Sequence, residues 1–406
     1  MKLFYYFLFI LLLLYCSRSR KQLAQFMNNG VDMIELGDYK GAIETFNKAI
    51  EINPNLDRAF LNRGRAKTKL GDTEGAIKDY TKAIEIYPKY SAAFYNRAGS
   101  KAELEDYQGA INDYTQVIML DPQDRKGYFG RAVAREKSND NTGAINDYNK
   151  SIELDSSQSG PYFGRGLVKS KLLDLLGAIN DYNKSIELGN PDPMLYYSRG
   201  NAKLTLKEYS SAINDYTEAI KHNSHFGLYY YKRGESKFEM ADYKGAIIDF
   251  SDAIKFEPNF EMAYFMRGQI KGIKKNDVDA IEDYNKAIDL EPNKGIFYFY
   301  RATSLSSLKS YSDAIKDFDQ AIELDPTSEY AYYGRGIAKA LSNNYLSAIE
   351  DFTKVIEINP KYPDAYYYRG RAKLQINDQE GGCLDLITSK QLGYLISNEI
   401  VNSKCN

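Results

Sequence analysis

The sequence predicts an all-α solenoid of stacked helix pairs, and the strongest indication is a twelve-residue segment that occurs twice. GAINDYNKSIEL stands at residues 143–154 and again, unchanged, at residues 177–188. Related segments continue at the same 34-residue spacing in both directions, so that eleven repeats fill residues 23–396 without an insertion or a deletion. A period of this length is typical of a solenoid in which each repeat buries its apolar face only against its neighbours.

Each repeat predicts two helices separated by a short break. In residues 332–340 and again in residues 346–358 the apolar side chains recur at helical spacing, and residues 342–344 interrupt them. A proline ends the second helix in seven repeats, because proline cannot continue a helix. In ten of the eleven repeats the residue before the second helix is a good N-cap, which can accept from the free amides of the first turn. These residues are Asp38, Asp72, Asp106, Asp140, Asp174, Asp242, Asn276, Ser310, Asn344 and Asp378.

Small and aromatic residues complete a pattern that resembles the tetratricopeptide repeat family. Glycine or alanine recurs in the first helix, as at Gly200, and the second helix carries alanine, an aromatic residue and a further small residue, as at Ala212, Tyr216 and Ala219. With the 34-residue period and the terminal proline, this pattern covers residues 23–396. The resemblance implies a right-handed superhelical solenoid whose first helices line a concave groove. It also implies a non-catalytic protein–protein interaction scaffold that binds a protein or peptide segment in that groove.

The first helix departs from the family pattern by carrying two cations four residues apart. An arginine recurs from Arg63 to Arg369, and a lysine or arginine follows it except at Leu305. The second helix carries an aspartate at the matching place, from Asp79 to Asp385, and the first repeat lacks all three residues. This joint loss predicts that arginine and aspartate pair inside a repeat. We interpret the pattern as a structural ion-pair ladder; the alternative is a cationic groove for an acidic ligand.

Aromatic residues form the candidate binding surface. One position of the first helix, directly after the packing aromatic residue, is expected to face the groove and is aromatic in nine consecutive repeats: Tyr95, Phe129, Phe163, Tyr197, Tyr231, Phe265, Phe299, Tyr333 and Tyr367. Contiguous exposed apolar surface generally marks an interaction site. The alternative is that these rings pack between neighbouring first helices as additional core. The family's clamp for chaperone C-termini uses lysine and asparagine where aromatics stand here, so that ligand is not expected.

Residues 1–22 predict a targeting segment or a membrane anchor. Residues 3–16 are uninterruptedly apolar or aromatic, with Lys2 before them and Arg18, Arg20 and Lys21 after them. Fourteen residues rise about 21 Å as a helix, which is short of the roughly 30 Å hydrocarbon core. A signal peptide, a lipoprotein signal ending at Cys16, and a short uncleaved anchor remain open. We therefore expect an exported or membrane-associated protein; an uncleaved anchor would also allow the array to lie on the cytoplasmic face of a membrane.

The C-terminal end predicts a cap. Gly382, Leu386 and Ser389 replace the usual alanine, aromatic residue and alanine in the last repeat, and residues 394–406 are expected to form a capping helix. The three cysteines, Cys16, Cys383 and Cys405, show no metal-ligand spacing, and no disulfide framework is expected from them.

Composition and motifs exclude several classes of function. A net charge of −2 and a pI near 6.0 provide no basic field, so no nucleic-acid partner is expected. No catalytic triad, phosphate loop or metal-ligand cluster is visible, so we expect neither an enzyme nor a cofactor. The two histidines, His222 and His225, are interpreted as solvated loop residues. The alternative functions are a targeting or regulatory subunit of an enzyme complex, or an intracellular regulator. Membrane contact is expected only through the N-terminal segment, and the sequence does not define the oligomeric state.

Overall fold

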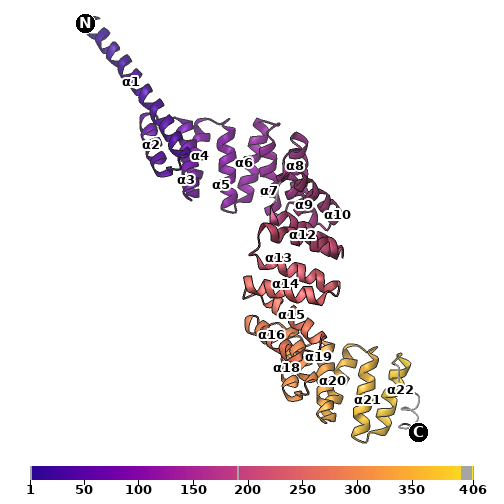
Figure 1. The fold of residues 1–406 in the computed structure, drawn as a ribbon. Coiled ribbons are helices and arrows are strands. Elements are labelled where there is room, and N and C mark those ends of the chain that lie inside the picture. The colour runs from indigo at the N-terminus through magenta and orange to yellow at the C-terminus, as the bar shows by residue number, and fades with distance from the viewer. Residues whose placement is uncertain (1, 190–191, 395–404, 406) are drawn as a thin grey trace. The chain divides into compact units, whose positions relative to one another are not determined.

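The computed structural model describes residues 2–189, 192–394 and 405, with side chains described from residue 19 onward. All regular structure in these residues is α-helical, in 22 helices that within each of two compact units follow one another as antiparallel neighbours (Figure 1). The predicted all-α solenoid of helix pairs is therefore confirmed.

The chain divides into two compact units. The N-terminal unit is Met1–Pro191 and the C-terminal unit is Asp192–Asn406. The helices of the N-terminal unit are α1 (Lys2–Glu35), α2 (Tyr39–Ile52), α3 (Asp57–Lys69), α4 (Thr73–Ile86), α5 (Ser91–Glu103), α6 (Tyr107–Leu120), α7 (Arg125–Lys137), α8 (Asn141–Leu154), α9 (Ser159–Lys171) and α10 (Leu175–Glu187). Those of the C-terminal unit are α11 (Pro193–Thr205), α12 (Tyr209–His222), α13 (Gly227–Glu239), α14 (Tyr243–Phe256), α15 (Glu261–Ile273), α16 (Asp277–Leu290), α17 (Gly295–Ser307), α18 (Tyr311–Leu324), α19 (Glu329–Leu341), α20 (Tyr345–Ile358), α21 (Pro363–Gln375) and α22 (Gln379–Gln391).

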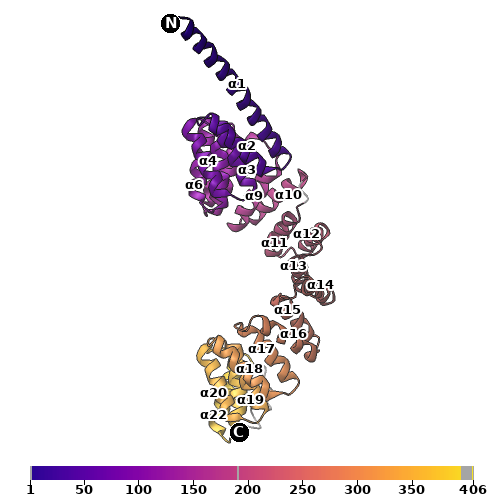
Figure 2. The ribbon, with the colours of Figure 1, turned by 90° about the vertical axis from the view of Figure 1, so that its left-hand side faces the viewer.

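Helix α1 joins the predicted N-terminal segment to the first repeat. It runs without a break from Lys2 to Glu35, so the expected boundary between residues 22 and 23 is not a break in the helix, and its N-terminal part extends beyond the other helices (Figure 2). Among the described residues, none of the helices combines the length and the apolar character that crossing a membrane requires. Cleavage or lipidation of this segment stays a prediction.

The first helices of neighbouring repeats lie on the inner side of each unit's curvature. Within each unit most odd-numbered helices contact the next odd-numbered helix, whereas comparable contacts between successive even-numbered helices are absent from the described residues. The surface formed by the exposed sides of the odd-numbered helices is here called the first-helix face. It corresponds to the expected groove.

The core of each repeat lies between its two helices. The second helix presents an alanine that is fully buried, such as Ala212, and an aromatic ring that is almost fully buried, such as Tyr216. The first helix approaches this ring so closely that a Cβ at Gly200 would lie 2.7 Å from Tyr216 Cε1. Burial of large aromatic side chains supplies most of the apolar stabilisation here.

Seven of the ten predicted N-caps form, and glycine three residues later distinguishes them. Asp38, Asp72, Asp106, Asp140, Asp174, Asp242 and Asp378 accept from the amide of Gly41, Gly75, Gly109, Gly143, Gly177, Gly245 and Gly381. A Cβ on any of these glycines would collide with the aspartate carboxylate.

The prediction was wrong for Asn276, Ser310 and Asn344, whose side chains make no cap bond. Asp279 and Asp313 occupy the glycine position in two of these repeats, and they accept hydrogen bonds from Asn276 Nδ2 and Ser310 Oγ instead. A serine occupies that position after Asn344. In these three repeats a side chain thus stands where the seven capped repeats have glycine.

We expect Asp242→Ala to lower the free energy of unfolding of the C-terminal unit by about 1 kcal/mol, because it removes an N-cap. Asn344→Ala is the matched control: it removes a side chain from the same place in another repeat, where no cap bond exists. Chemical denaturation of both variants checks this. Equal losses would contradict the dependence of capping on glycine.

A disulfide joins the last helix to the chain end, which corrects the expectation that the cysteines form no disulfide. Cys383 in α22 is bonded to Cys405, and their Cα atoms lie 5.5 Å apart. The chain turns after α22 at Gly393, which has a φ of +98°, and Tyr394 stacks on Tyr367 of α21 at a ring distance of 4.6 Å. The spacing of the cysteines in the sequence does not reveal this pairing. The predicted capping helix at 394–406 lies almost entirely outside the described residues.

Candidate functional site

The predicted ion-pair ladder is present in all ten repeats that carry its residues. Each arginine donates through Nη2 to the aspartate sixteen residues later at 2.5–2.8 Å, and Nε donates to the same carboxylate. In nine repeats the second cation reaches that carboxylate at 2.7–2.9 Å. Pairing inside a repeat is therefore confirmed.

Within each unit, the arginine of a repeat also connects that repeat to the preceding one. Arg97 Nη1 donates to Thr81 Oγ1 on the second helix of the preceding repeat, and Arg267 makes the same contact with Ser251. The guanidinium groups lie over the aromatic ring three residues earlier, as Arg97 does over Phe94 at 5.5 Å. These contacts satisfy the arginine within the protein. They favour the structural interpretation over a cationic groove for an acidic ligand.

The nine predicted aromatic residues are half-buried or buried. Tyr231 and Phe265 are only 8% and 5% exposed. Eight of the nine rings pack against the buried aromatic ring of their own second helix at 5.5–6.1 Å. Several also contact the next repeat, as Phe265 contacts Phe297 at 4.9 Å. The packing alternative therefore describes most of their surface, and their role in partner binding stays a prediction.

The exposed apolar residues of the first-helix face are not the nine predicted aromatic residues but residues near them in the sequence. In the C-terminal unit, Ile296 and Tyr330 are 47% and 59% exposed. Together with Phe299 and Tyr300 they line a pocket of about 410 Å³ between α17, α18 and α19. Phe299 is thus the predicted aromatic residue that the structure places at a pocket wall.

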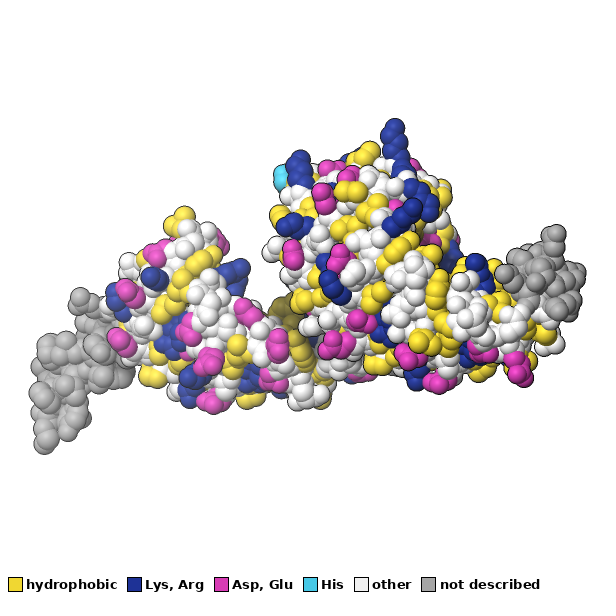
Figure 3. All heavy atoms as spheres, turned by 90° about the horizontal axis from the view of Figure 1, so that it is seen from below, with side chains coloured by type: hydrophobic (Ala, Val, Ile, Leu, Met, Phe, Trp, Pro, Cys, Tyr) yellow, Lys and Arg dark blue, Asp and Glu magenta, His cyan; other side chains and the backbone are white. Residues whose placement is uncertain are grey.

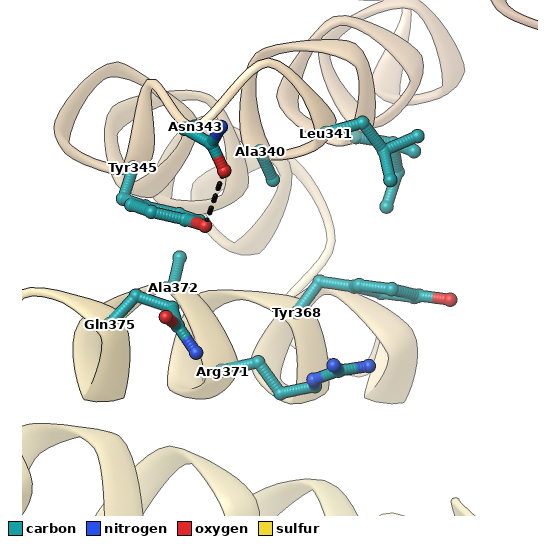
Figure 4. Close-up of a pocket in the computed structure, with 9 residues that line it drawn as sticks. Ala340, Leu341, Asn343, Tyr345, Tyr368, Arg371, Ala372 and Gln375 are labelled. Atoms are coloured by element: carbon teal, nitrogen blue, oxygen red, sulfur yellow. Dashed lines mark hydrogen bonds between the residues drawn. The ribbon is translucent and has the colours of Figure 1, made fainter. Parts of the chain in front are cut away.

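A second pocket of about 290 Å³ opens one repeat further along, between α19 and α21 (Figure 4). Ala340 and Ala372 face each other across its middle, which leaves room between the helices. Leu341, Tyr368 and Arg371 line one side of it. Sequence reasoning missed this pocket, although the variation of these positions between repeats was a usable signal.

Burial keeps the second-helix tyrosines protonated. Burial raises the pKa of Tyr182 to about 12, although a hydrogen bond with Ser170 lowers it in part. The pKa values of Tyr80, Tyr114, Tyr148, Tyr216 and Tyr284 are raised by burial in the same way. These phenols therefore stay neutral hydrogen-bond donors at physiological pH, as Tyr216 does toward Asn201 Oδ1 at 2.8 Å.

We expect stability to fall above pH 10. Between pH 10 and 12 the unfolded chain loses the proton that folded Tyr182 keeps, so the folded state binds more protons and stability decreases as pH rises, by at most about 1.4 kcal/mol per pH unit for each such tyrosine. Tyr182→Phe should reduce this dependence. Denaturation midpoints at pH 8 to 11.5 check it, and an unchanged slope in Tyr182→Phe would contradict it.

Charges of both signs are interspersed with apolar side chains on the face drawn in Figure 3. Within the described residues, His, Cys, Asp and Glu side chains form no group of three or more that could hold a metal ion. The first-helix face of the C-terminal unit thus carries two pockets, one lined mainly by apolar and aromatic residues and the other by apolar and polar residues.

These features define a helical-repeat solenoid, and comparison with known families identifies which one. A model described as TPR repeat matches residues 33–71 and 305–342, and models described as tetratricopeptide repeat match 58–90, 95–161, 195–224, 263–294 and 330–362. Together they match more than half of the residues. The chain belongs to the tetratricopeptide repeat family.

Solved structures with the same fold match the chain at low identity. YrrB, a TPR protein with an unusual peptide-binding site, is 24% identical over 44% of this chain and 92% of its own, with a TM-score of 0.41. A tetratricopeptide repeat protein from Parabacteroides merdae is 20% identical over 62% and 99%, with a TM-score of 0.47. Yeast Tom70 is 17% identical over 95% of both chains, with a TM-score of 0.38. Curated proteins give no significant match.

Proposed function

We propose that this protein is a non-catalytic scaffold that binds a protein or peptide segment on its first-helix face. The observation that carries the proposal is the pair of pockets at successive first-helix junctions of the C-terminal unit, with exposed Ile296 and Tyr330 beside one of them. Exposed aromatic and aliphatic anchors beside pockets are the surface features that dominate binding of peptide segments. The family supports a role in protein interaction.

The nine predicted aromatic residues, here called the aromatic row, lie beneath the exposed side chains of this surface. Half-buried rings such as Phe299 and Tyr333 pack against the second helices. Phe299 lines one pocket, and Tyr333 contacts Tyr368, which lines the other. Tyr231 and Phe265 are buried and serve this role through packing. Under this proposal the more exposed neighbours supply the anchors, and the row supplies rigidity.

The proposal is tested by replacing one exposed anchor. Tyr330→Ala should weaken a bound partner at least tenfold, which is about 1.4 kcal/mol, with little loss of stability. Leu346→Ala is the matched control, because Leu346 is comparably exposed but stands on the second helix α20. Titration of a labelled partner peptide gives both affinities. Equal affinity for native protein and a folded Tyr330→Ala variant would contradict the proposal.

We further propose that the protein is exported or held at a membrane by its N-terminal segment. The apolar run at 3–16 with basic flanks and the Cys383–Cys405 disulfide support this, because disulfides form and persist in oxidising compartments. Fractionation with mass spectrometry of the mature N-terminus tests it. A protein that retains Met1 and reduced cysteines in a soluble cytosolic fraction would contradict it.

A further inference from the structure

The pocket between α19 and α21 combines apolar walls with a cation at its edge. Ile337 and Leu341 come from α19, and Tyr368 and Arg371 come from α21 (Figure 4). Tyr368 is held in place by Phe352, with the two rings stacked at 6.0 Å, and by Tyr333 at 5.8 Å. Its wall is therefore preformed, and Gln375, one helical turn beyond Arg371, adds an exposed amide.

Arg371 differs from the ladder cations of this unit because its charge is not neutralised by a carboxylate. Among the described residues, Arg371 is exposed and lacks a carboxylate within ion-pair distance. Its guanidinium lies over the ring of Tyr367 at 5.6 Å, and Nη1 donates to the Tyr367 hydroxyl at 3.4 Å. These contacts orient the group without supplying a negative charge.

Other cations on the first helices of this unit do have acids. Lys232 pairs with Glu235 at 2.8 Å, and Lys294 pairs with Glu261 at 2.9 Å. Each ladder arginine likewise has its aspartate, as Arg369 has Asp385. Among the described first-helix residues of this unit, Arg371 is thus a cation that lacks an acid and that also lines a pocket.

We infer that this pocket binds an aspartate or glutamate side chain adjacent to an apolar side chain of a partner peptide. A carboxylate would neutralise the charge of Arg371 in a bidentate ion pair, and the Gln375 amide can donate a hydrogen bond to the same carboxylate. The apolar neighbour would enter between Leu341 and Tyr368, in a pocket whose volume of about 290 Å³ suits side chains. This inference rests on the proposed function, because it specifies which residues of the partner peptide the same first-helix face would recognise.

The preceding repeat provides a natural comparison. At the same position, 34 residues before Arg371, the chain has Ile337, and Gly334 replaces Tyr368. Ile337 and Gly334 do not line the other pocket. That pocket, which is bordered by Ile296 and Tyr330, lies between α17, α18 and α19 and carries no cation among its lining residues. Acid recognition is therefore expected at the α19–α21 pocket and not at the α17–α19 pocket.

The test is selection from a random ten-residue peptide display library, with each peptide flanked by neutral linkers so that no terminal carboxylate is present. The full chain, Arg371→Glu and the matched control Lys361→Glu are the baits; Lys361 is an exposed lysine of the same unit outside the pocket. Arg371→Gln repeats the test without introducing a charge. Selected peptides are resynthesised, acetylated and amidated, with the acid kept or changed to its amide, and measured by fluorescence anisotropy.

The expected result is that native protein and Lys361→Glu enrich an acid beside an aliphatic or aromatic residue. Arg371→Glu should bind those peptides at least tenfold more weakly, and changing the peptide acid to its amide should weaken native binding to a similar extent. Selected peptides without acid preference that bind Arg371→Glu equally well would overturn this inference and leave the proposed function standing. Failure of every bait to select any peptide would contradict both.

Discussion

Asp249→Ala is expected to lower the free energy of unfolding of the C-terminal unit by about 3–5 kcal/mol, the range for removing one partner of a buried ion pair. Asp249 is fully buried and accepts from Arg233 and from Lys237, both at 2.7 Å. Its loss leaves two partly buried cations facing each other without an acid. The effect should exceed that of Arg233→Ala, because Asp249 then still has Lys237. Urea denaturation of the unit's helical signal measures all three proteins.

The chain contains a matched control for this prediction. Asp317 has a single cation, Arg301, because Leu305 stands where the second cation usually is, and its side chain is more exposed than that of Asp249. Asp317→Ala should therefore destabilise the unit less. A loss below 1 kcal/mol for Asp249→Ala, the range of an exposed pair, would show that the ladder does not support the array.

Removal of the disulfide is expected to have the second largest effect. The bond closes a loop between residues 22 apart, and closing a loop of about this size stabilises a fold by about 3 kcal/mol in the chain-entropy model. The effect should be local, because each repeat of a solenoid contacts only its neighbours. We expect a variant with Cys383→Ser and Cys405→Ser to lose hydrogen-exchange protection in α22 and α21, while α13 and α14 keep theirs.

Reduction of the native protein should reproduce that pattern, and the double variant should not respond to reductant. Leu386 replaces the large aromatic ring of the other second helices, so α22 has less apolar packing to compensate for loss of the bond. Unchanged exchange of α22 amides after reduction would contradict a stabilising role for the disulfide.

The repeat pattern predicted most of the fold because each structural role recurs at the same place in many repeats. The joint absence of arginine, lysine and aspartate from the first repeat predicted pairing within a repeat, and the structure confirms it in every case. The junction bond, such as that from Arg97 to Thr81, was not predicted, because its acceptor varies between threonine, asparagine, serine and aspartate.

The candidate site was predicted less well. A position that is aromatic in nine repeats was expected to be exposed on the groove, whereas it is mostly packed. The position of Tyr231 and Phe265 is aromatic in nine repeats because it packs against another conserved feature of the repeat, the second-helix ring. Positions that differ from repeat to repeat, such as those of Tyr330 and Arg371, carry the exposed surface. The three failed N-caps and the disulfide have a related reason, since residue type alone specifies neither a cap bond nor which cysteines approach each other.

The central claim, that the first-helix face binds the partner, is tested most directly by photo-crosslinking. A photoreactive phenylalanine analogue placed at Tyr330 on α19 or at Leu346 on α20 samples two sites of similar exposure on opposite kinds of helix. With a bound partner peptide, mass spectrometry should find crosslinks from position 330 and few from position 346. Crosslinks that form from position 346 and not from position 330 would contradict the account.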